Sequence, residues 1–126
     1  MSWDTGLKSL SLKEAKKEGY LLTPTDDSRR VRITKRVFNP KTRKNRRISL
    51  GEFRIELFAS TYNIGKKKED KDLSKNVWFV FVEIPGRLVN SLRNIRIEFG
   101  EITLFDLKKL GVKTPYEIDL ISWLKL

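Results

Sequence analysis

Apolar and polar residues alternate along much of the chain, and a period of two is the pattern of a β-strand with one buried face. The alternating stretches lie around Val31 and Ile33 and over 46–53, 54–64 and 95–99. A further stretch, Val77–Ile84, is apolar at nearly every position, which predicts a central strand with two covered faces. The parity of the apolar positions slips at Gly51, so we expect a β-bulge or a tight bend there.

Capping motifs predict three short helices, each with Ser or Thr followed three residues later by Glu or Asp. The motifs lie at Ser11–Glu14, Thr103–Asp106 and Thr114–Glu117. The first helix is expected over 12–18 and the third over 115–123, and glycines stop the first two at Gly19 and Gly111. A fourth helix is predicted after Pro85, because the apolar residues that follow have helical spacing: Leu88, Val89, Leu92 and Ile95.

These elements predict an α+β fold, with a twisted, mostly antiparallel sheet of about four to five strands and about three to four short helices. The length of 126 residues suits one domain. Its expected parts are an N-terminal helix and turn over 1–28, the sheet over 29–99 and the C-terminal helices over 100–126. Polar turns are expected at 23–28 and from Asn39, and a charged loop over 65–76.

Charge changes this picture, because the net charge of +11 is concentrated in one stretch. Residues 29–47 hold ten Lys or Arg and no Asp or Glu. Since the cations alternate with strand-forming residues, a rigid basic hairpin is predicted, and such a hairpin suits phosphate neutralisation. The alternative is a solvated strand pair in a heat-adapted protein, which would normally place Glu opposite Lys.

The residue types present give little indication of a catalytic function. Cysteine and histidine are absent, which excludes disulfides, thiolate or imidazole metal sites and Cys or His catalysis. No glycine-rich phosphate loop occurs. Glu52, Glu56 and Glu83 could gather on one sheet around a metal, but we expect them to balance neighbouring arginines. The chain is therefore predicted not to be an enzyme and to use no cofactor or metal.

Two aromatic residues extend the hypothesis to unpaired strands. Phe58 and Tyr62 share the predicted strand face of Arg54, and nucleic-acid bases stack on such rings. The alternative places both rings in the core, where we also expect Trp78, Phe79 and Phe81.

The stretch 47–95, under half of the chain, resembles the positive-cofactor-four family of transcriptional coactivators. RRISLGEF resembles the opening strand of that family, RIELFASTYN its aromatic-ended second strand, and VWFVFVEIPGRLVNSLRNI its strand followed by a helix. The resemblance implies a curved antiparallel sheet, dimerisation and binding of single-stranded DNA. It also implies a strand-binding groove lined by Arg46, Arg47, Arg54, Phe58, Tyr62 and Lys66–Lys68.

The predicted function is non-catalytic binding of nucleic acid, preferentially single-stranded DNA with low sequence specificity. The basic hairpin tracks phosphates and the sheet aromatics stack bases. The candidate binding residues are Arg29, Arg30, Arg32, Lys35, Arg36, Lys41, Arg43, Lys44, Arg46, Arg47, Arg54, Phe58, Tyr62, Lys66, Lys67 and Lys68.

Two other functions stay open. The hairpin could instead dock an acidic protein partner, in which case Trp3, Trp123, Leu124 and Leu126 suit a protein contact; or the ligand could be RNA, which a sequence does not distinguish from DNA. A homodimer is compatible with either function. The absence of a long apolar run and the early Asp4 predict an intracellular protein that is cytoplasmic, nucleoid-associated and not bound to a membrane. Abundant Lys, Arg and Glu suggest a thermophilic, archaeal or viral source, although an AT-rich genome would also favour Lys.

Overall fold

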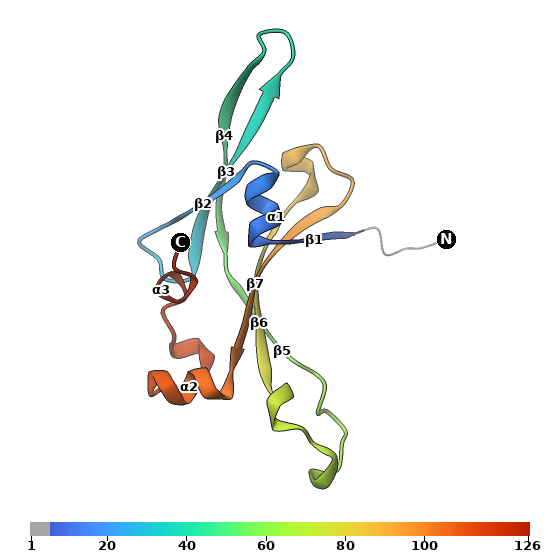
Figure 1. The fold of residues 1–126 in the computed structure, drawn as a ribbon, viewed down its shortest axis with the longest axis vertical. Coiled ribbons are helices and arrows are strands. Elements are labelled where there is room, and N and C mark those ends of the chain that lie inside the picture. The colour runs from blue at the N-terminus through green and yellow to red at the C-terminus, as the bar shows by residue number, and fades with distance from the viewer. Residues whose placement is uncertain (1–5) are drawn as a thin grey trace, which may run out of the picture.

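The computed structural model describes residues 6–126, which form seven strands in two sheets (Figure 1). Sheet A has the order β1 (Leu7–Ser11), β7 (Asn94–Thr103), β6 (Val77–Ile84) and β5 (Glu56–Ala59). Sheet B has the order β2 (Tyr20–Pro24), β3 (Arg30–Asn39) and β4 (Lys44–Arg54). The helices are α1 (Leu12–Lys17), α2 (Leu104–Leu110) and α3 (Leu120–Leu124). The α+β class is confirmed, with two sheets in place of one; Trp3 and Asp4 lie outside the described residues.

Both sheets pack against one hydrophobic core. Val31 and Ile33 of β3 and Val82 and Ile97 of sheet A are fully buried and belong to the same cluster. Within sheet A, β6 pairs with β5 on one side and β7 on the other, so its predicted central position is confirmed. Every pairing is antiparallel except that of β1 with β7, which is parallel.

A long hairpin of β3 and β4 extends beyond the rest of the molecule, at the top of Figure 1. The register shifts between Ile33 and Thr34, opposite Gly51, whose φ of +113° favours glycine. The predicted bulge at Gly51 is therefore confirmed. We call residues 36–47 the arm, because every residue there is exposed.

The predicted helix after Pro85 does not form. Gly86–Val89 make a single 3₁₀ turn, which Asn90 ends in the left-handed conformation with φ 54°. Leu92 is fully exposed, and the chain enters β7 at Asn94. The strand-then-helix stretch quoted for the family resemblance thus forms a strand, a turn and the start of the next strand.

Other elements also differ from the predictions. The strand expected over 54–64 breaks at Ile55, which is buried where the chain leaves sheet B, and β5 ends at Ala59. The helix expected over 115–123 is divided into a 3₁₀ turn at Pro115–Glu117 and helix α3, with Ile118 extended and buried between them. Strands β1 and β2 were not predicted.

The capping boxes at both ends of the chain are confirmed, and they make stability depend on pH. The backbone amides of Ser11 and Thr114 donate to Glu14 and Glu117 at 2.9 and 2.8 Å. These hydrogen bonds lower the pKa of both carboxyls from 4.5. A carboxyl with a lowered folded-state pKa stabilises the protein above its unfolded pKa, and that contribution is lost as the pH falls through the folded value.

We expect the melting temperature to fall as the pH is lowered through and below 4.5. The fall should be shallower in a Glu14→Gln/Glu117→Gln variant, which has no such carboxyls to titrate. Glu69→Gln is the control, because the Glu69 carboxylate forms no hydrogen bond with the described residues. Thermal melts followed by circular dichroism would measure this, and parallel curves for all three proteins would contradict it.

Candidate nucleic-acid interface

One face of sheet B carries five arginines. Alternation along β3 and β4 places a set of side chains on the side away from the core, which we call the arginine face. From β3 it comprises Arg30, Arg32, Thr34, Arg36 and Phe38, and from β4 it comprises Asn45, Arg47, Ser49, Glu52 and Arg54.

Only part of this charge is compensated within the described residues. Arg32 donates to Glu52 at 2.8 Å across the two strands. Arg30 lies 3.6 Å from Asp27 in the preceding turn. Both pairs are about half exposed, and exposed pairs of this kind stabilise little.

Two pairs of arginines lie directly opposite each other. Arg36 is in register with Arg47, and Arg30 is in register with Arg54. Like charges directly opposite in an antiparallel pair are destabilising, so the fold holds a repulsion that a bound polyanion would relieve.

An aromatic residue that was not among the candidates lies on the same face. Phe38 is two residues beyond Arg36 along β3, and its side chain is 57% exposed. Its parity matches that of Arg30, Arg32 and Arg36, and this parity was the signal that could have identified it from the sequence. An exposed ring among arginines can stack a base beside its phosphate.

The arm adds cations beyond the arginine face. Lys41 and Arg43 lie in its turn, where the Asn39 side chain accepts from the Lys41 amide at 2.9 Å and Arg43 adopts φ 55°. Lys44 and Arg46 lie on the other face of β4, away from Phe38 and the arginine face. All four are exposed, so the end of the arm is positively charged on both faces and at its tip.

Three of the predicted cations also have contacts within the fold. Lys35 points to the other side of β3, donates to the Glu18 carbonyl at 2.6 Å and lies 4.4 Å from the Tyr20 ring centroid. Its partial burial lowers the pKa of its amine. Arg29 donates to the Tyr116 carbonyl, and Arg47 donates to the Thr34 hydroxyl at 3.1 Å. Arg47 is therefore held in place on the arginine face.

The other candidates lie elsewhere. Phe58 is on sheet A, and Tyr62 with Lys66–Lys68 is in the loop after β5, at the end of the molecule opposite the arm (Figure 1). The Lys66 amine lies 3.4 Å from the Tyr62 ring centroid and covers one ring face. The predicted groove that combines these residues with Arg46, Arg47 and Arg54 is not assembled.

The three glutamates considered as metal ligands do not form one cluster. Glu52 is on sheet B with Arg32, whereas Glu56 and Glu83 are on different strands of sheet A. Glu83 lies 3.4 Å from Arg96. Among residues 6–126 no group of three or more potential ligands is close enough to hold a metal ion.

No protein-family model, curated protein or solved structure matches this chain. No helix in the described part of the chain is long and apolar enough to cross a membrane.

Proposed function

We propose that this protein binds nucleic acid, with a preference for single strands, through the arginine face and the arm. The observation that carries the proposal is the set of five arginines on one exposed face, including two directly opposed pairs, with one carboxylate among them. A fold retains such repulsion at some cost to stability, and a row of phosphates neutralises it.

The preference for single strands rests on Phe38. A paired base has no free face for a protein ring, whereas an unpaired base can stack on one. Because Phe38 lies beyond Arg36 on the same strand face, a single strand that follows the arginines would bring a base over the ring. The proposal therefore assigns to Phe38 the role that the sequence suggested for Phe58 and Tyr62.

Equilibrium binding of the full chain to labelled single-stranded DNA, duplex DNA and RNA of one sequence, at several salt concentrations, tests this function. We expect the logarithm of the association constant to fall linearly with the logarithm of salt concentration, by about 0.7 per neutralised phosphate on single strands. Poly-glutamate is the matched polyanion without phosphates or bases. If it displaces DNA as well as an equal charge of unlabelled DNA does, the arm recognises acidic protein surfaces and the proposal fails.

Replacing Phe38 by Ala should weaken binding to single-stranded DNA by about 1–3 kcal/mol and binding to duplex DNA much less. The ring is mostly exposed, so the melting temperature should change little. Phe105→Ala is the control, because Phe105 is also mostly exposed, at 73%, but lies on helix α2. Titrations of both variants with both ligands would measure the effect, and equal losses on single-stranded and duplex DNA would show that Phe38 does not stack on a base.

A further inference from the structure

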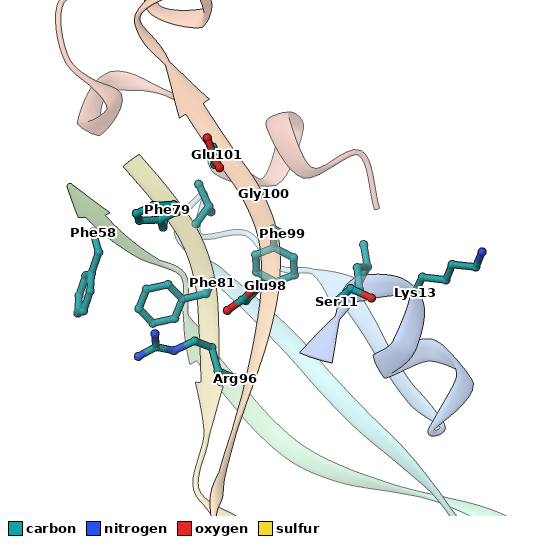
Figure 2. Close-up of a pocket in the computed structure, with 12 residues that line it drawn as sticks. Ser11, Lys13, Phe58, Phe79, Phe81, Arg96, Glu98, Phe99, Gly100 and Glu101 are labelled. Carbon is teal, nitrogen blue, oxygen red and sulfur yellow. The ribbon is translucent and has the colours of Figure 1, made fainter. Parts of the chain in front are cut away.

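The outer face of sheet A is aromatic and acidic. The registers of β5, β6 and β7 place its side chains together, and we call them the acidic face: Phe58, Phe79, Phe81, Glu56, Glu83, Arg96, Glu98 and Glu101. Figure 2 shows the three phenylalanines side by side, with Arg96 beside Phe81 and Glu101 beyond Phe79. Part of this face lines a depression of about 740 Å³.

Two of the phenylalanines are unusually open to solvent. Phe58 and Phe79 lie directly opposite each other on adjacent strands and are 54% and 44% exposed. Phe79 was expected in the core, but it points away from it, whereas Phe81 is buried and packs edge-on against Phe58 at 4.9 Å. An exposed aromatic pair on the face of a sheet is typical of a surface that another molecule covers.

The net charge of this face is negative, which favours a positively charged molecule as its partner. Four glutamates and one arginine give −3, and Glu83 alone is close to that arginine, at 3.4 Å. Glu56, Glu98 and Glu101 form no ion pair with any of the described residues. Lys13 also lines the depression, but its side chain extends away from the phenylalanines (Figure 2).

The acidic face already binds one guanidinium, that of Arg96, between an aromatic ring and a carboxylate, and a basic partner could be bound in the same way. The guanidinium carbon of Arg96 lies 4.0 Å from the centroid of the Phe81 ring, with Glu83 as its ion-pair partner. A second ring and carboxylate lie next to each other two residues earlier on β6, where Phe79 is in register with Glu101 of β7. No described cation stacks on Phe79.

We propose that the acidic face binds the basic arm of a second copy of this chain. Charge complementarity supports this occupant, because the arm carries Arg36, Lys41, Arg43, Lys44, Arg46 and Arg47 with no acidic residue. Two acidic faces packed against each other would repel, so the contact joins the arm of one copy to the acidic face of another. The proposal does not depend on nucleic-acid binding, but a polyanion that occupies the arm would dissociate the contact.

Sedimentation velocity of the nucleic-acid-free full chain tests the contact. At low salt we expect association that increases with protein concentration, and at high salt a monomer. Charge reversal of the face, Glu98→Lys/Glu101→Lys, should weaken association by about tenfold or more, since two attractive charges become repulsive. The control is Glu69→Lys/Asp70→Lys, which makes the same change of net charge in the loop after β5.

A mixing experiment then identifies the two surfaces. The arm variant Arg43→Glu/Lys44→Glu and the face variant should each associate poorly alone. A one-to-one mixture should restore association, because the unchanged arm of the face variant meets the unchanged face of the arm variant. Circular dichroism melts establish that both variants fold. A monomeric wild-type protein at low salt, equal losses in face and loop variants, or a mixture no stronger than its components would each overturn the proposal.

Discussion

Replacing Arg30, Arg36, Arg47 and Arg54 together by Ser is expected to weaken binding to single-stranded DNA by about 10²–10³-fold at about 0.1 M salt. The reason is the loss of four phosphate contacts, which should also flatten the plot of log association constant against log salt by about 2.8. Titrations at several salt concentrations give both quantities from one data set.

The matched control removes the same charge elsewhere. Lys66, Lys67, Lys68 and Lys71 lie in the loop after β5, and their replacement by Ser should change the salt dependence little. If both variants lose affinity equally, net charge alone accounts for binding and the arginine face has no special part. The melting temperature adds a second criterion: the arginine variant should hold or gain stability, because two directly opposed like-charge pairs are removed.

The largest expected loss of stability comes from Gly86→Ala. A Cβ atom at this position would lie 2.3 Å from the Arg93 carbonyl oxygen and 2.5 Å from that of Ser91. Both atoms belong to the backbone of the turn that leads into β7, so neither can move as a side chain would. We expect a loss of about 3 kcal/mol, at the upper end of the range for overpacking.

Gly6→Ala is the control for this change, because a Cβ at Gly6 would meet no atom within 4 Å. Its effect should stay within about 0.5 kcal/mol. Urea unfolding followed by circular dichroism would compare the two variants with the wild type. A Gly86→Ala protein as stable as the wild type would mean that the turn at 86–93 rearranges without cost.

Features set by a few neighbouring residues were predictable from the sequence. The capping boxes at Ser11, Thr103 and Thr114 and the bulge at Gly51 depend on local hydrogen bonds and local backbone geometry, and all are present. The strand Val77–Ile84 was recognised by its apolar run, with both ends correct.

Features set by distant contacts were not predictable in the same way. The apolar spacing after Gly86 fits a helix, but the close approach of Arg93 to Gly86 and the left-handed Asn90 turn the chain back into sheet A within a few residues. Alternation likewise continues through Ile55, so it gave no sign that the chain passes there from one sheet to the other.

The same distinction between local and distant determinants applies to the candidate site. The basic hairpin was evident from charge and alternation, and the structure forms it. The grouping of Phe58 and Tyr62 with Arg54 required one strand to run through all three, and that strand ends at Ala59. Phe38 could have been predicted from the sequence, because its place on the arginine face follows from alternation along a single strand, the one that contains Arg36.

The parallel pairing of β1 with β7 has a consequence for the order of folding. Leu7 pairs with Asn94 and Ser11 with Glu98, so β1 acquires its sheet partner only after most of the chain has been synthesised. Sheet B has no such delay, because β2, β3 and β4 are consecutive and pair through short connections. During translation the arm can therefore form early, while β1 stays unpaired until β7 emerges from the ribosome. A nascent chain stalled before Asn94 would have its cations already displayed on a hairpin and its sheet A still incomplete.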